Sequence, residues 1–286
     1  MTIAVLDAQP QTPSARALME RALDPYILLG MPHLTPAGLS ETWLMKELGH
    51  RHWLMLARHL GMDNADFRTA DGREVYASIC ATSLTGAKLR LARANDVLAI
   101  RSSLYRISRA QYSSRHHLSI GGRDIADVEL ISAFVRRNIE GDNRSLVRVE
   151  HARSKGDMLA TSELAATAAA LRRGTAETHL GMAPAVGRHL KSFRFKPSTT
   201  EEFNGAGLFY FAEFQAVMTR ALEAWFPKQR LEVLRRDVFL KGNIRGGDAV
   251  ILELSAVKPD DTGIACRLLR SDGTEIAALF ALLRDS

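Results

Sequence analysis

The residues that could carry out chemistry in the first half of the chain lie in residues 29–45, where His33 is followed by the polar pair Ser40 and Glu41. Two prolines and a glycine oppose regular structure before residue 39, and Ser40 is a good N-cap for the apolar helix that follows. The free N–H groups of a helix start favour an anion or a thioester oxygen. His33 could hydrogen-bond a substrate carbonyl or only fasten its loop. Ser40 and Glu41 also fit the plain roles of helix cap and solvated first-turn carboxylate.

A similar arrangement returns in the second half. Residues 206–208 repeat the Ala-Gly-Leu of residues 37–39 and again lead into an apolar helix, which indicates a duplicated unit. Asn204 stands in the turn before this helix, where its side chain could face a substrate or serve as an ordinary turn residue. Tyr210 and Glu213 are separated by one helical turn and share a face. A Glu213 buried beside the thioester would favour hydrolysis or dehydration, and an exposed one would carry no functional signal.

The histidines do not predict a metal centre. His50, His52 and His59 lie on one helix beside arginines, and this pattern favours a surface or interface role over metal binding. His116 and His117 are adjacent in a strand, so they face opposite ways and cannot share one ion. We therefore expect no metal site.

The composition is that of an ordinary globular protein, with 46% hydrophobic and 24% charged residues, and the length suits one large domain or two small fused ones. No apolar run is long enough to cross a membrane, and no signal-peptide pattern occurs. Cys80 and Cys266 lie in separate strand-like segments. This placement predicts small apolar side chains packed in the core of a protein in a reducing compartment, and not a disulfide framework. We expect a cytoplasmic protein. The net charge of +6 favours an acidic partner, but no nucleic-acid-binding motif accompanies it.

The remaining elements follow from the periodicity of apolar residues. Residues 39–60 predict a long helix, which Gly49 could break or kink, and residues 208–225 predict a second one. Gly121 and Gly122 form the clearest hairpin turn. The expected strands are 25–29, 74–82, 96–105, 112–120, 125–135 and 145–149 in the first half, and 188–195, 231–240, 249–257, 264–269 and 276–283 in the second. A helix with an antiparallel sheet, twice over, predicts an α+β tandem (double) hot dog fold.

We expect four regions along the chain. They are an N-terminal arm over residues 1–24, a first hot dog over 25–150, a connector over 151–187 and a second hot dog over 188–286. The connector is rich in alanine and threonine and could form a helix that buries little. The two sheets are expected to join edge to edge, because joining covers strand edges that would otherwise be open to aggregation.

Four segments carry a resemblance to a known family. They are residues 30–34 (GMPHL), 38–44 (GLSETWL), 49–53 (GHRHW) and 203–211 (FNGAGLFYF). The chain resembles the double hot dog family that contains the leinamycin-type bifunctional acyltransferase/decarboxylases of polyketide pathways. The resemblance implies transfer of a malonyl- or methylmalonyl-type group from coenzyme A to an acyl carrier protein, with loss of carbon dioxide. It implies no permanently bound cofactor, since the coenzyme A thioester is the substrate and phosphopantetheine belongs to the carrier protein.

The resemblance also suggests site residues. A family tyrosine accepts the acyl group or positions the enolate, and Tyr76 is the position that matches it, with Tyr210 as a substitute. Decarboxylation needs preorganised donors for the thioester oxygen, but no strong base. The predicted catalytic residues, which we expect to meet in the groove between the two halves, are Tyr76, His33, Ser40 and Asn204. The predicted substrate-binding residues are Thr82, Glu41, Tyr210 and Glu213.

Two other function classes stay open. In hot dog thioesterases and dehydratases an acidic residue near the helix acts as general base, so Glu213 would support hydrolysis or dehydration of carrier-bound chains. A non-catalytic acyl-carrier docking protein is the third class. Arg136, Arg137, Arg235 and Arg236 could steer an acidic carrier or hold the phosphates of coenzyme A. The sequence names neither the acyl group nor the oligomeric state, a homodimer included.

Overall fold

The first half of the protein is an antiparallel sheet around one long helix, α2 (Glu41–His59). The computed structural model describes residues 12–285 except 70, 151–158, 185–188 and 261. The strands of this half are β1 (Tyr26–Leu28), β4 (Tyr76–Thr85), β5 (Val97–Arg106), β6 (Gln111–Ile120), β7 (Arg123–Arg137) and β8 (Leu146–Arg148). Strands β6 and β7 meet at the expected hairpin, where Gly121 and Gly122 have φ angles of 55° and 76°. Glycine adopts such angles without a steric cost.

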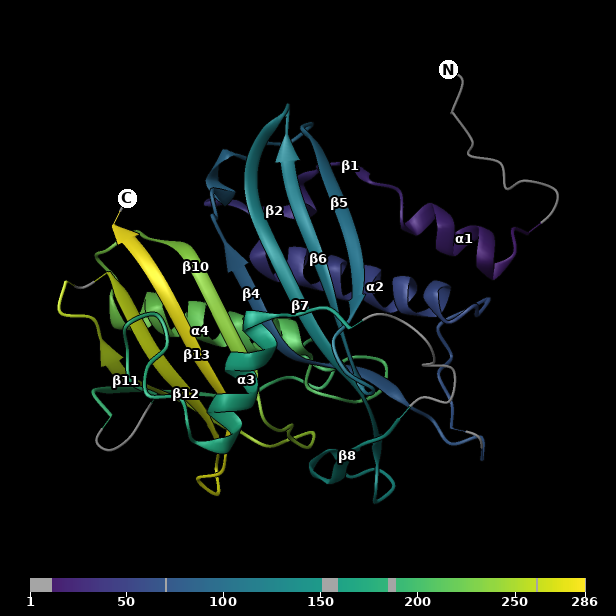
Figure 1. Cartoon of the computed structure of the whole chain (residues 1–286). Helices are drawn as coiled ribbons and strands as arrows, with labels where there is room; N and C mark the ends of the chain where they lie inside the picture. The colour runs from purple at the N-terminus through teal and green to yellow at the C-terminus, as the bar shows by residue number, and fades with distance from the viewer. Residues whose placement is uncertain (1–11, 70, 151–158, 185–188, 261, 286) are drawn as a thin grey trace.

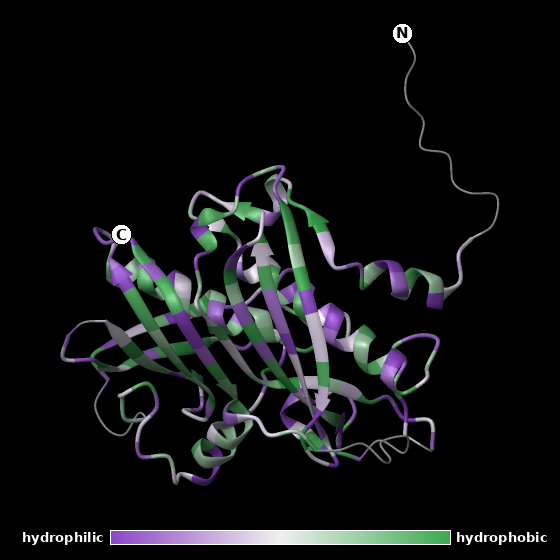
Figure 2. Ribbon diagram, turned by 45° about the horizontal axis from the view of Figure 1, so that its top comes forward, coloured by the Kyte–Doolittle hydropathy of each residue, from purple (hydrophilic) through white to green (hydrophobic). Residues whose placement is uncertain are grey.

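The second half repeats this plan around helix α4 (Phe211–Trp225). Its strands are β9 (Lys191–Phe195), β10 (Leu231–Leu240), β11 (Val250–Val257), β12 (Gly263–Arg270) and β13 (Glu275–Asp285). One face of α4 packs into a core of aliphatic and aromatic side chains from these strands. Figure 2 shows hydrophobic and hydrophilic residues alternating along several strands, as expected where one face of a sheet packs on helices.

The two sheets join edge to edge, as predicted. Strand β4 pairs antiparallel with β10, from Leu84 opposite Arg236 to Ala81 opposite Phe239. The continuous order is β1-β5-β6-β7-β4-β10-β13-β12-β11-β9, with β8 attached to β7. Figure 1 shows α2 and α4 packed on this sheet. The chain therefore has an α+β double hot dog fold, and the predicted fold class is confirmed.

Helices α2 and α4 touch at Gly49. A Cβ atom on this residue would lie 2.5 Å from Cε1 of Phe211 and 3.0 Å from the hydroxyl of Tyr210. The helix runs through Gly49 without interruption, so the predicted break is wrong. The glycine is there because the two helices come too close for a side chain.

The segment before α2 is a compact loop. It contains the 3-10 turn η1 (Met31–His33) and the two-residue strands β2 (Leu34–Thr35) and β3 (Gly38–Leu39). Gly38 has a φ of 107°, and a Cβ there would collide with the backbone of η2 (Leu89–Leu91). Ser40 caps α2 as predicted, because its Oγ accepts from the N–H of Trp43 at 3.2 Å.

The segments outside the two repeats pack more closely than expected. Helix α1 (Ala15–Ala22) buries Met19 in the cluster that contains the end of α2. Helix α3 (Glu163–Arg173), in the connector, packs Leu164, Ala168 and Leu171 on the outer face of the joined sheet. The prediction that the connector helix buries little is therefore wrong. Connector residues 151–158 and 185–187, and arm residues 1–11, lie outside the described residues.

Helix α4 begins later than predicted. It starts at Phe211 and not at Leu208, because the chain before it is held in a turn by side-chain hydrogen bonds to backbone N–H groups. Asn243 Oδ1 accepts from the N–H of Phe209 at 3.0 Å, and Asn243 Nδ2 donates to its carbonyl at 3.0 Å. Among the helices that the structure describes, none is long and apolar enough to span a membrane.

Candidate active site

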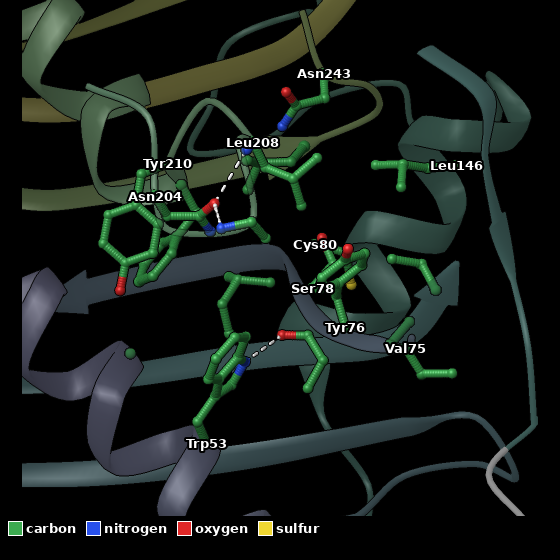
Figure 3. Close-up of a pocket in the computed structure, with 18 of the residues that line it drawn as sticks. Trp53, Val75, Tyr76, Ser78, Cys80, Leu146, Asn204, Leu208, Tyr210 and Asn243 are labelled. Carbon is green, nitrogen blue, oxygen red and sulfur yellow. Dashed lines mark hydrogen bonds between the residues drawn. The ribbon is translucent and has the colours of Figure 1, made fainter. Parts of the chain in front are cut away.

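A cavity of about 530 Å³ opens at the seam between the two halves. Strands β4 and β10 pair only over residues 81–84 and 236–239, so residues 76–80 of β4 have no ladder partner on the β10 side within the described chain. The cavity borders these residues. It is lined by α2 and β4 from the first half and by residues 204–211 and 240–243 from the second (Figure 3). Both halves therefore contribute to one site.

The second half supplies two hydrogen-bond donors to the cavity. Asn204 Oδ1 accepts from the N–H groups of Ala206 at 3.1 Å and Leu208 at 3.0 Å, which closes the turn before α4. The Nδ2 group of Asn204 has no partner among the described residues. The Tyr210 hydroxyl likewise lacks a hydrogen-bond partner there. Burial, with the negative charge of Glu213 and Glu47, raises the Tyr210 pKa to about 12. Tyr210 is therefore a neutral donor at physiological pH.

Tyr76 lines the cavity with its ring, but its hydroxyl is already engaged. The hydroxyl donates to Oε2 of Glu74 and accepts from the guanidinium of Arg137 at 2.7 Å. Burial and the Glu74 hydrogen bond raise the Tyr76 pKa, while the charge of Arg137 opposes them. Tyr76 must exchange the Glu74 hydrogen bond for a substrate oxygen before it can act on a thioester.

Arg137 and Asn143 fasten the two halves together beside Tyr76. Arg137 donates to Asn143 Oδ1 through Nε at 3.1 Å and through a terminal nitrogen at 2.9 Å, and it also donates to the carbonyl of Ala206. Asn143 in turn donates to the carbonyls of Gly207 at 2.6 Å and Ile244 at 2.9 Å. The turn that holds Asn204 is thus fixed against the first sheet by buried polar contacts.

His50 is a cavity residue that the sequence analysis did not select. It projects from α2 next to Gly49, and its side chain is exposed. Trp53, one turn further along the helix, also lines the cavity and donates through Nε1 to the carbonyl of Ala77 at 2.9 Å. The usable signal in the sequence was Gly49, a glycine inside a helical pattern, to which His50 is adjacent.

The predicted meeting of His33 and Ser40 with Tyr76 and Asn204 is wrong. Neither His33 nor Ser40 lines the cavity. His33 Nδ1 accepts from the N–H of Gly30 at 2.8 Å and its ring packs on Trp43 at 4.5 Å, so His33 fastens its loop. The cavity lies at the middle of α2, whereas these residues precede or cap the helix start.

The start of α2 lies instead against a buried arginine of the second half. Arg236 is 2% exposed, sits 3.4 Å from the carboxylate of Glu41 and donates to the Gln215 carbonyl at 2.9 Å and the Thr219 hydroxyl at 3.0 Å. Burial raises the Glu41 pKa, and the charge of Arg236 opposes this shift. Glu41 is thus an internal partner and not a cavity residue. Arg236 is closed off from any carrier protein, which corrects that part of the predicted docking set.

Two further predicted substrate-binding residues also lie outside the cavity lining. Glu213 is buried in the first turn of α4 and forms an ion pair of 2.7 Å with Lys46 of α2. Thr82 is buried in β4 opposite Val238 of β10. Of the predicted set, the cavity brings together Tyr76, Asn204 and Tyr210.

The structure confirms one prediction about the histidines and corrects another: His116 and His117 face opposite ways as predicted, but His52 is buried and has no surface or interface role. His116 is buried and His117 is partly exposed, on opposite faces of β6. His52 points into the core, where its ring nitrogens lie 2.7 Å from the hydroxyls of Ser114 and Ser132. Over the residues that the structure describes, no group of three histidine, cysteine, aspartate or glutamate side chains could hold a metal ion.

Comparisons with known proteins identify the fold. No protein-family model and no curated protein matches the chain. Among solved structures, a 12:0-ACP thioesterase from Umbellularia californica is similar with a TM-score of 0.67 and 8% identity, over 91% of this chain and 96% of that one. An acyl-ACP thioesterase from Bacteroides thetaiotaomicron has a TM-score of 0.63 and 7% identity, over 91% of this chain and 96% of that one. At identities this low, the structural similarity shows a shared fold and nothing more.

Proposed function

We propose that the protein is an enzyme that acts on an acyl thioester of coenzyme A or of an acyl carrier protein. The observation that carries the proposal is the cavity at the seam. It combines an apolar lining with the amide of Asn204 and the phenol of Tyr210, two donors that have no partner in the described part of the chain. Such donors suit a thioester oxygen that gains negative charge. The two fold relatives are named as thioesterases of acyl carrier proteins, which supports the same class of substrate.

We favour acyl transfer with decarboxylation of a malonyl- or methylmalonyl-type thioester. The carboxylates that line the cavity are Asp66 and Glu74, and both are occupied, by Arg68 at 2.9 Å and by the Tyr76 hydroxyl. Glu213, the residue expected to act as base in a hydrolase, is paired with Lys46 outside the cavity. A cavity with donors, in which the carboxylates of the described lining are already paired, suits a reaction that needs oxygen stabilisation more than proton abstraction.

The proposed decarboxylation breaks the bond between the carboxylate and the α carbon. Carbon dioxide leaves, and the electron pair remains as an enolate whose oxygen accepts hydrogen bonds from Asn204 and Tyr210. His50, exposed to the cavity, returns a proton to the α carbon. In the transfer, the carrier sulfur bonds to the acyl carbon while the sulfur of coenzyme A leaves with the proton of the incoming thiol. Tyr76 either holds the enolate oxygen or takes the acyl group first. In the second case its phenol oxygen bonds to the acyl carbon, coenzyme A leaves with the phenol proton, and the carrier thiol then displaces the phenol and returns a proton to it.

Thioester hydrolysis is the second candidate. His50 is an imidazole in the cavity with no partner among the described residues, and it could activate a water molecule without help from Glu213. This reaction would match the names of the two fold relatives.

Intact-mass analysis of a holo carrier protein separates these reactions. The carrier is incubated with the protein and methylmalonyl-coenzyme A, and a propionyl adduct is the expected product. A methylmalonyl adduct would mean transfer alone. Loss of the acyl group from a preloaded carrier would mean hydrolysis. A carrier that stays unchanged in both incubations, with no free coenzyme A released from methylmalonyl-coenzyme A, would refute the enzymatic proposal and leave docking.

Two variants test the donors. Asn204→Asp keeps the oxygen that closes the turn but removes the N–H donor, and Tyr210→Phe removes only the hydroxyl. Each should lower turnover on the order of a hundredfold, the scale of losing one preorganised donor. Lys228→Gln, an exposed change beyond α4, is the control. Wild-type turnover in both donor variants would remove these residues from the site.

A further inference from the structure

Two arginines line the cavity. Arg148 lies at the end of β8 and Arg172 in the last turn of α3, and both border the cavity together with Cys80 of β4. Within the described residues, neither guanidinium forms an ion pair or a hydrogen bond with an acidic side chain. Most other arginines near the site are already engaged, such as Arg137 with Asn143 and Arg68 with Asp66.

The fold holds these two positive charges near each other. Strand β8 places Arg148 opposite Val135 of β7, and α3 is fixed on the sheet by three buried side chains, one of which is Leu171, next to Arg172. Partial burial of the guanidinium lowers the Arg172 pKa, and the charge of Arg148 lowers it further. Like charges brought together at the edge of a cavity are unfavourable when the cavity is empty of anions. They become favourable when an anion lies between them.

We propose that Arg148 and Arg172 bind the phosphate of the group that carries the thioester, which is phosphopantetheine on a carrier protein or coenzyme A itself. This inference rests on the proposed function. Both arginines are exposed, whereas Asn204 and Tyr210 are only partly exposed. A phosphate at the exposed end would leave the pantetheine chain to reach inward with the acyl group.

The carboxylate of a malonyl-type acyl group is the less suitable anion for this pair. Two guanidiniums would stabilise the carboxylate in the ground state and so oppose loss of carbon dioxide. A phosphate does not react, so strong binding there lowers the free energy of substrate and transition state alike. The pair also replaces the predicted phosphate ligands Arg236, which is buried, and Arg137, which holds Tyr76.

Calorimetric titration tests the site without any turnover. Wild-type protein is titrated with pantetheine, 4′-phosphopantetheine and coenzyme A, alongside Arg148→Gln and Arg172→Gln. The control is Arg173→Gln, a neighbouring exposed arginine of α3 that does not line the cavity. We expect each cavity variant to bind 4′-phosphopantetheine about tenfold more weakly, the effect of one charged hydrogen bond. Binding of pantetheine, and every affinity of the control, should stay at the wild-type value.

The outcomes show which phosphate the arginines bind, and they distinguish failure of this inference from failure of the proposed function. If the variants weaken 4′-phosphopantetheine and coenzyme A equally, the arginines bind the phosphate next to pantetheine. If they weaken coenzyme A alone, the arginines bind its nucleotide phosphates. Variants that bind all three compounds as the wild type does, or that lose pantetheine equally, would overturn the inference and leave the proposed function intact. A wild-type protein that binds none of the compounds would overturn both.

Discussion

Acid should destabilise this protein well above the pH at which carboxylates titrate, because two histidines are buried in one hydrogen-bonded chain. His52 and His116 share the hydroxyl of Ser114, at 2.7 Å and 2.8 Å. Ser132 completes the chain at one end at 2.7 Å and Ser102 at the other at 2.8 Å. Burial lowers the pKa of each histidine from 6.5 to about 3. The folded protein therefore keeps both rings neutral where the unfolded chain protonates them.

The sign and size of the effect follow from linkage. Between pH 6.5 and about 3 the unfolded state binds more protons, so stability falls as the pH falls. At pH 5 the loss should be about 2 kcal/mol for each histidine, or about 4 kcal/mol for the pair. This is a large part of a typical stability of about 5–15 kcal/mol. His117 has a raised pKa and acts in the opposite direction, but its exposed pairs with Asp124 and Asp127 are screened by solvent.

Urea unfolding followed by tryptophan fluorescence at pH 7, 6 and 5 measures this loss. His52→Gln removes one of the two groups while keeping hydrogen-bonding capacity, so it should about halve the pH dependence. His50→Gln, on the same helix but facing the cavity, is the matched control. A free energy of unfolding that stays level from pH 7 to pH 5 would refute the reasoning. So would a His52→Gln variant whose free energy of unfolding depends on pH as strongly as that of the wild type.

Three further predictions concern the helices, the tyrosine and the partner. Gly49→Ala should lower stability by about 1–3 kcal/mol in thermal unfolding, since its Cβ would lie 2.5 Å from Phe211; an unchanged midpoint would show that the helices can separate freely. Tyr76→Phe should fold normally and lower turnover about a hundredfold, and a wild-type rate would shift the catalytic assignment to Tyr210. Transfer to an acidic carrier should slow as salt rises to physiological strength, because the protein carries a net charge of +6; rates that stay constant would argue against steering.

Local pattern determined the elements of this protein. Alternation of apolar residues located the strands, and Gly121 and Gly122 located a hairpin because few other residues adopt their φ angles. Ser40 located the start of α2 through a contact three residues away. The repetition of helix and strands then gave the double hot dog fold, and adjacency in a strand separated the faces of His116 and His117. These features depend on neighbours within a few positions, which a sequence records directly.

The site needed the tertiary structure. The sequence placed His33 in the loop before α2 and His50 within the helix. Only the packing of α4 against Gly49 shows that the cavity lies at the middle of the helix. In the sequence Arg236 is indistinguishable from a surface arginine, but in the joined sheet it is buried against Glu41. Contacts such as these join residues far apart in the chain. The sequence by itself determined the two repeats. The packing of one repeat against the other decided which side chains line the common cavity and which are buried.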